Sequence, residues 1–249
     1  MKIIDLTMMI DEQTPVFPGD LKQEIKQVAA IEKDGWNEKR ISFSSHFSTH
    51  IDAPFHMLKE GKKLTDYPLD RFIGDGVVID ARNNSELGVD YVKQNNPELS
   101  LYKIKENKSK SSFNEVKLNN LKSSLDNNRQ NNLKLSLDNV RQNDIVFFYT
   151  GRTKKAGSEE FFKKNPTISK GLAQRLIDKK IKIVGLDSFT PDNAPFEIHK
   201  LFFKHDILIV ENLVNLEKLI GKRFKCYILP LKIKDADGAP CRVIGVIDE

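Results

Sequence analysis

Short apolar runs separated by polar stretches dominate the hydrophobic pattern of this chain. They are rich in Ile, Val, Leu and Phe and are too short for typical helices, so we interpret them as buried strands. The runs cover residues 3–9, 77–80, 145–149, 183–186, 207–210, 227–233 and 243–247. The pattern therefore predicts strands spread along the whole chain.

Two segments between these runs have helical spacing. Residues 169–180 are amphipathic, with Ser169 as a suitable N-cap and an apolar stripe of Leu172, Leu176 and Ile177. Residues 213–220 are a second, shorter helix candidate. Strands and helices interspersed in this way indicate a single mixed α/β domain that spans the chain, residues 1–249.

Polar and apolar residues alternate strongly between positions 41 and 53. In a strand, alternate side chains point to opposite faces, so one face would present His46, His50 and Asp52 in a row. A helix could also bring His46 and His50 together, because they are four residues apart. The β-favouring residues in this stretch and the nearby Pro54 favour the strand, which Pro54 would end.

Histidine is concentrated in the same segment. Three of the five histidines, His46, His50 and His56, fall within eleven residues, beside Asp52. Imidazole and carboxylate together suit a borderline divalent ion such as zinc or manganese. The glutamate of the HExxH metalloprotease pattern is absent, which argues against that class.

Further candidate ligands lie in the second half of the chain. His199 precedes an apolar run, and Glu211 directly follows the run at 207–210. Taken alone, Glu211 fits a solvated strand end better than the rim of a site. His205 lies among charged residues, and we interpret it as a surface residue.

The composition is that of a soluble globular protein. Hydrophobic residues make up 39% of the chain, and no apolar run reaches the roughly 18 residues of a membrane span. The N-terminal segment fits a first strand better than it fits a signal peptide. Cys226 and Cys241 are interpreted as free thiols, with a single disulfide as the alternative. These features predict a cytoplasmic protein without a membrane partner.

The net charge of +5 belongs to one segment. Ten Lys/Arg and five Asp/Glu lie between residues 93 and 143, so the rest of the chain is neutral. Residues from about 94 to 132 are rich in Asn, Lys and Ser, and the 12-residue sequence 120–131 is repeated at 132–143 with ten identities. We interpret the segment as a polar surface insertion with a duplication. A nucleic-acid-binding arm is the alternative, but the interleaved aromatic residues that stack on bases are lacking, so we expect no nucleic-acid partner.

The histidine segment also resembles a known family. HFSTHIDAPFH at 46–56 resembles the HxGTHxDxPxH signature of the cyclase family, which includes bacterial kynurenine formamidases and isatin hydrolases. Further similar pieces follow in the same order: TPVFPGD at 14–20, NPTIS at 165–169, VGLD at 184–187, ENL at 211–213, PLKI at 230–233 and ADG at 236–238. The resemblance covers nearly the whole chain apart from the insertion.

This resemblance implies a three-layer β/β/α fold, two bound divalent ions, zinc or else manganese, and a homodimer or homotetramer. The implied metal ligands are His46, His50, Asp52, His199 and Glu211, with Asp52 placed to bridge the two ions. His56 is the implied general acid/base. The implied substrate is a small amide, either an N-formyl aryl amine or a cyclic amide, attacked by a metal-activated water.

Two positions depart from the family pattern. Ser48 replaces the glycine between the first two histidines, which adds a side chain on the expected ligand face. Phe17 replaces the tryptophan common at the pocket, so it is a candidate substrate-binding residue, with core packing as its alternative. Phenylalanine offers a smaller apolar face and no indole N–H. Both changes argue against kynurenine as the substrate more than they argue against hydrolysis.

Three functions are consistent with these residues. The first is a two-metal amidohydrolase of the formamidase or ring-opening kind. The second is other metal-assisted chemistry in the same family, such as lactone hydrolysis or dehydration. The third is a metal-binding protein without activity, against which the complete ligand set argues.

Overall fold

The structure of the protein is a computed structural model that describes residues 1–82, 84–88 and 137–248. The polar insertion predicted at about 94–132 and the first copy of the repeat lie outside these described residues. Within the described part of the chain, every helix is too short or too polar to cross a bilayer.

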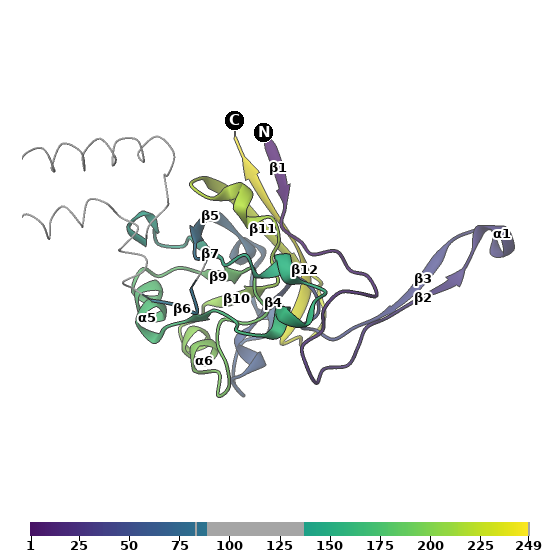
Figure 1. Cartoon of the computed structure of the whole chain (residues 1–249), viewed down its shortest axis with the longest axis horizontal. Coiled ribbons are helices and arrows are strands. Elements are labelled where there is room, and N and C mark those ends of the chain that lie inside the picture. The colour runs from purple at the N-terminus through teal and green to yellow at the C-terminus, as the bar shows by residue number, and fades with distance from the viewer. Residues whose placement is uncertain (83, 89–136, 249) are drawn as a thin grey trace, which may run out of the picture.

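Eight strands form one mixed sheet (Figure 1). In sheet order they are β1 (Lys2–Asp5), β12 (Gly238–Ile247), β11 (Arg223–Pro230), β5 (Ile73–Asp80), β7 (Ile145–Tyr149), β9 (Ile183–Leu186), β10 (Leu208–Glu211) and β4 (His50–Asp52). The strands β5, β7, β9 and β10 run parallel, and the other pairings are antiparallel. Because β4 also pairs with the start of β12, the sheet closes on itself.

Alternate side chains of the central strands enter two separate cores. Val78 and Phe147 belong to the core enclosed by the curled sheet, whereas Val77 and Val146 pack on its outer face. The helices α5 (Lys170–Asp178) and α6 (Glu197–Lys204) cover that outer face. Two sides of the sheet and one helical layer make the expected three-layer β/β/α arrangement. Strands buried on both faces have continuous apolar sequences, which explains the short apolar runs seen in the sequence.

Shorter elements complete the described chain. They are β2 (Glu24–Ala29), α1 (Ile31–Asp34), β3 (Glu38–Ser42), β6 (Glu86–Leu87), β8 (Thr167–Ile168) and the 3-10 helices η1 (Pro54–His56), η2 (Leu64–Asp66), η3 (Leu69–Phe72), η5 (Leu137–Asn139), η6 (Arg152–Lys155), η7 (Glu159–Phe162) and η8 (Leu216–Leu219). The strands β2 and β3 form a hairpin with α1 at its tip, and this arm projects far from the body (Figure 1).

Several sequence predictions are confirmed. The helix predicted from Ser169 is α5, and the Ser169 hydroxyl accepts a hydrogen bond from the backbone N–H of Leu172. The predicted strands at 145–149 and 183–186 are β7 and β9. Cys226 and Cys241 are free and buried, so the disulfide alternative is wrong.

Other predictions need correction. The strand predicted across 41–53 is interrupted, because β3 ends at Ser42, β4 begins at His50, and Ser48 between them has a left-handed backbone with φ 57°. The helix predicted at 213–220 is only the 3-10 turn η8, and the strands predicted at 3–9 and 227–233 end at Asp5 and Pro230.

Candidate metal centre

The histidine-rich segment folds into a turn, a short strand and a 3-10 helix. His46 lies in the turn after β3, His50 and Asp52 belong to β4, and His56 ends η1. Pro54 begins η1, where its missing N–H costs no hydrogen bond. The segment thus doubles back on itself, so that His46 contacts Asp52 across six residues.

Strand pairing brings the C-terminal half of the chain to this segment. The strand β4 lies between β10 and β12, with His50 opposite Glu211 and Asp52 opposite Gly238. Directly opposed residues of antiparallel strands lie about 5 Å apart, so their side chains share one neighbourhood. Glu211 is only 5% exposed, so its interpretation as a solvated strand end is wrong.

His199 reaches the cluster from α6. Its Nδ1 is hydrogen-bonded to Asp192, and its Nε2 lies 3.4 Å from Oε1 of Glu211. The second oxygen of Asp192 accepts the backbone N–H of Ile198 at 2.6 Å. Asp192 therefore fixes both the start of α6 and the orientation of the His199 ring.

Asp52 lies at the centre of the cluster. Its Oδ1 is 2.7 Å from Nδ1 of His46 and 3.3 Å from Nε2 of His50, and Oε2 of Glu211 is 3.4 Å from the same His50 nitrogen. Two groups of possible metal ligands share Asp52, one with His46 and His50 and the other with His199 and Glu211, and the atoms of each group lie within 4.8 Å of one another. All five predicted ligands are therefore brought together.

The donor atoms fit divalent cations. His50 and His199 bind the Ser48 carbonyl and Asp192 through Nδ1, so the Nε2 atom of each faces the cluster. Oε1 of Glu211 is buried and makes no hydrogen bond to the described part of the chain. A buried carboxylate oxygen without a partner is costly unless a cation compensates it. This oxygen, together with the imidazole nitrogens around it, indicates a cation site.

Burial and charge oppose each other in this cluster. Burial disfavours the imidazolium forms, but the surrounding carboxylates raise the pKa of His46 to about 10 and that of His199 to about 9. Burial also disfavours a charged Asp52, yet the neighbouring histidines hold the pKa of this carboxyl well below its usual value. The protein therefore keeps a carboxylate ready for a cation, while its imidazoles hold protons that the cation must displace.

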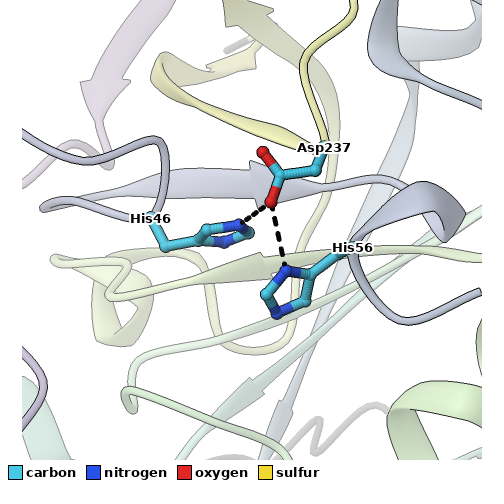
Figure 2. Close-up of side chains that lie close together, drawn as sticks. All are labelled: His46, His56 and Asp237. Carbon is cyan, nitrogen blue, oxygen red and sulfur yellow. Dashed lines mark hydrogen bonds and ion pairs between the residues drawn. The ribbon is translucent and has the colours of Figure 1, made fainter. Parts of the chain in front are cut away.

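His56 lies at the edge of the cluster, and its ring centroid is 3.9 Å from that of His46. One carboxylate oxygen contacts both rings (Figure 2): Oδ2 of Asp237 is 2.8 Å from Nε2 of His46 and 3.3 Å from Nδ1 of His56. Asp237 directly precedes β12. These three side chains are partly exposed, unlike the other four predicted ligands, which are buried.

A cavity of about 320 Å³ adjoins the cluster, and five phenylalanines line it: Phe17, Phe161, Phe162, Phe189 and Phe196. The rings of Phe162 and Phe189 have centroids 5.0 Å apart, and both lie within 6.3 Å of Phe17. Phe17 is 43% exposed, so core packing does not describe it. The cavity thus joins a polar, cation-binding wall to an aromatic wall.

The structure adds residues that the sequence argument missed. Asp192 and Asp237 orient histidines of the cluster, and Phe162 and Phe189 form much of the aromatic wall. Asp237 carried a signal, because it lies in the ADG piece of the resemblance. Ser48 also differs from expectation, since its hydroxyl donates to the Met8 carbonyl at 3.1 Å instead of facing the ligands.

The comparison with family models decides the family. A model described as putative cyclase matches residues 4–193 of the chain. The chain belongs to the cyclase family. This assignment agrees with the three-layer fold and with the clustered histidines and carboxylates.

Relatives of the chain include named enzymes of this family. It is 27% identical over 245 residues to a kynurenine formamidase of Bacillus cereus, covering 97% of this chain and 95% of the relative. It is also 43% identical over 105 residues to an uncharacterized protein of Methanocaldococcus jannaschii, covering 42% of this chain and 54% of the relative. The full-length likeness supports a hydrolase of the cyclase family.

Solved structures share the fold. An isatin hydrolase bound to the product analogue thioisatinate superposes with a TM-score of 0.75 at 20% identity, covering 100% of this chain and 93% of the other. A potential metal-dependent hydrolase with cyclase activity superposes with a TM-score of 0.69 at 23% identity, covering 98% and 96%. At this level of identity the likeness establishes the fold alone.

Proposed function

We propose that the protein is a two-metal hydrolase of a small amide that carries an aryl group. The observation that carries this proposal is the buried cluster around Asp52, which lies beside a cavity with an aromatic wall. Buried ligands favour tight ion binding, and the aromatic wall favours a flat apolar substrate. The names of the relatives, kynurenine formamidase and isatin hydrolase, agree with an aryl amide.

The proposed ligand sets follow the two overlapping groups of side chains. His46 and His50 would hold one ion, His199 and Glu211 would hold the other, and Asp52 would be shared. Zinc and manganese both suit these nitrogen and oxygen donors. When bound, such ions supply Lewis acidity, which polarises the amide carbonyl and acidifies water.

His56 is the proposed general acid/base. It lies at the edge of the cluster, next to a ligand histidine and facing the cavity, and an imidazole can accept and return protons near neutral pH. In the reaction, a water oxygen forms a bond to the amide carbon, and the C–N bond breaks. His56 would take the proton from the water and deliver it to the leaving nitrogen.

The substrate class follows from the aromatic wall. Rings that pack at 5 to 6 Å centroid separations in edge or tilted geometry add favourable energy to their apolar contact. Phe17, Phe162 and Phe189 already pack with one another in this way, so an aryl ring could extend the same stack. An N-formyl aryl amine or a cyclic aryl amide meets both requirements, the ring and the polarised carbonyl.

The deciding experiment measures ion content and turnover together. Protein purified without a metal-binding tag should contain about two zinc or manganese ions per chain and hydrolyse N-formyl aryl amines or cyclic amides. Glu211→Gln should lose at least one ion and most of the activity. Glu159→Gln, an exposed glutamate, is the matched control and should keep both. Wild-type protein that takes up no zinc or manganese would contradict the proposal.

We also propose that the protein forms homodimers or homotetramers in the cytoplasm. The projecting hairpin supports the oligomer, because Val28, Ile31, Trp36 and Ile41 on this arm are each more than half exposed. Two free, buried thiols support the reducing compartment. Light scattering should give at least twice the chain mass of 28.5 kDa, and Trp36→Ser/Ile41→Ser should lower it. A monomeric wild type would rule out the oligomer.

A further inference from the structure

We propose that Asp237 is a positioning residue that couples the metal ligand His46 to the general acid/base His56. The inference rests on the proposed function and extends it to a residue outside the proposed ligand and acid/base sets. A single oxygen, Oδ2 of Asp237, contacts a nitrogen of each ring (Figure 2). The carboxylate would thereby fix the orientation and tautomer of both imidazoles.

The first contact selects which nitrogen of His46 faces an ion. Nδ1 lies 2.7 Å from Asp52, inside the buried ligand group, and Nε2 lies 2.8 Å from Asp237 on the outer side. A neutral imidazole has one N–H, and a ligating histidine commonly donates it to a carboxylate. Asp237 therefore places the proton on Nε2 of His46 and leaves the Nδ1 lone pair for the cation.

The second contact acts in the same way on His56. Oδ2 of Asp237 lies 3.3 Å from Nδ1 of His56, which would donate its proton to that oxygen. Nε2 of His56 is then the basic nitrogen. Because this histidine lines the cavity, the arrangement leaves its proton-accepting atom available to the substrate rather than engaged by the protein.

Asp237 is held firmly enough to position these rings. Its backbone carbonyl accepts the N–H of Ala53 at 2.8 Å, and the following Gly238 pairs with Asp52. A Cβ atom at Gly238 would lie 2.6 Å from Cε1 of His46, so the glycine leaves the space in which the ring lies. Gly238 thus leaves space for the His46 ring, and the adjacent Asp237 supplies the carboxylate that orients it.

A different interpretation of these three side chains makes a distinct prediction. Ligand atoms of His46, His56 and Asp237 also lie within 4.8 Å of one another, so they could hold an ion themselves. In that case His56 would be a ligand, and its removal would release an ion. If Asp237 is a positioning residue, removal of His56 leaves the ion content unchanged.

The experiment uses the full chain and compares Asp237→Asn with Asp235→Asn. Asn has nearly the size of Asp but no charge, so its amide oxygen is a weaker acceptor for the two rings than the carboxylate oxygen. Asp235 is the matched control, because it lies two residues away, is exposed and pairs only with Lys63 among the contacts described. The readouts are zinc affinity by chelator competition, the visible spectrum of cobalt-substituted protein, and kcat and KM with an N-formyl aryl amine.

We expect Asp237→Asn to weaken zinc binding about 10- to 100-fold and to lower kcat by a similar factor at saturating zinc, with little change in KM. The cobalt spectrum should change, because the orientation of a ligand ring changes. In a His56→Ala background, Asp237→Asn should still weaken zinc binding but should cause no further fall in kcat. Asp235→Asn should match the wild type in every readout.

Two results would overturn the inference while leaving the proposed function intact. One is an Asp237→Asn protein with wild-type zinc affinity, cobalt spectrum and kcat. The other is a His56→Ala protein that loses an ion, which would make the three side chains a metal site. A wild type that binds no zinc or manganese would instead remove the proposed function and this inference together.

Discussion

Two histidine–carboxylate pairs flank the cluster, and they differ in burial and in the number of rings they serve. Asp192 and His199 are both buried, and the carboxylate orients that one ring while also accepting the backbone N–H of Ile198 in α6. Asp237 and His46 lie far apart in the sequence and are partly exposed. The Asp237 oxygen that contacts His46 also contacts His56. The inner pair is suited to orientation alone, because its carboxylate, Asp192, is not among the residues that line the cavity.

The difference indicates how one kind of contact can serve two purposes. A carboxylate that accepts an N–H from a ligating histidine fixes the ring wherever it lies. Only at the cavity edge can the same carboxylate also orient a group that exchanges protons with substrate. Variants that affect both ligand groups, one histidine–carboxylate pair, or only the neighbouring turn should therefore give graded effects.

The largest effect is expected from Asp52→Asn, because Asp52 belongs to both ligand groups. Loss of this shared charge should remove at least one ion and cost several kcal/mol of transition-state stabilisation, a fall of about 10³-fold or more in kcat/KM. Elemental analysis and steady-state kinetics measure the two effects. Full ion content in this variant would mean that the two groups bind independently of Asp52.

Asp192→Asn should affect the inner pair alone. Asn can still accept the backbone N–H of Ile198, so α6 should remain folded, but it is a poorer acceptor for His199. We expect a 10- to 100-fold loss of zinc affinity and a near-normal kcat at saturating zinc. Asp237→Asn should lower both zinc affinity and kcat, so equal kcat values for the two variants would contradict the difference between the two pairs.

The pH dependence of ion binding follows from His46. Its folded-state pKa of about 10 lies above the ordinary 6.5, so in the metal-free protein the charged ring stabilises the fold fully below pH 6.5, and this stabilisation is lost as the pH rises through about 10. Zinc needs the deprotonated nitrogen. Apparent affinity should therefore rise about tenfold per pH unit for each proton displaced between pH 6.5 and 8.5. Calorimetry in buffers of different ionisation enthalpy counts these protons, and a flat profile would show that none is displaced.

The smallest effect is expected from Gly61→Ala. A Cβ atom there would lie 2.3 Å from the backbone carbon of Pro54, so η1 and its His56 must shift. Such overpacking costs about 1–3 kcal/mol. We expect a lower Tm and a several-fold fall in kcat, with ion content unchanged. Gly88→Ala is the control, since no atom of the described residues lies within 4 Å of its Cβ position. Indistinguishable kinetics for the two variants would show that the position of η1 is not critical.

The parts of the fold that were predicted well have strong local patterns. The strands β7 and β9 are continuous apolar runs because both of their faces are buried, and α5 has a cap and an apolar stripe. The helix α6 was missed because its eight residues are preceded by Pro195 and Phe196, without a side-chain cap. The hairpin β2–β3 was missed because its side chains are mostly exposed and lack a buried face.

The site shows the same division. The predicted ligands His46, His50 and Asp52 were identified because they lie close together in the sequence. His199 and Glu211 were only candidates until the family resemblance implied a role for them. Asp192 and Asp237 were not assigned a role, because a lone acidic residue is usually a solvated one.

The sequence by itself determined the chemistry available and the elements with strong periodicity, since side-chain types and local burial patterns are properties of neighbouring residues. The tertiary structure alone decided which oxygen meets which nitrogen. Pairing of β4 with both β10 and β12 places Glu211 on one side of the histidine segment and Asp237 on the other. Such contacts join residues up to 191 positions apart, and they depend on strand order and register, which no local pattern encodes.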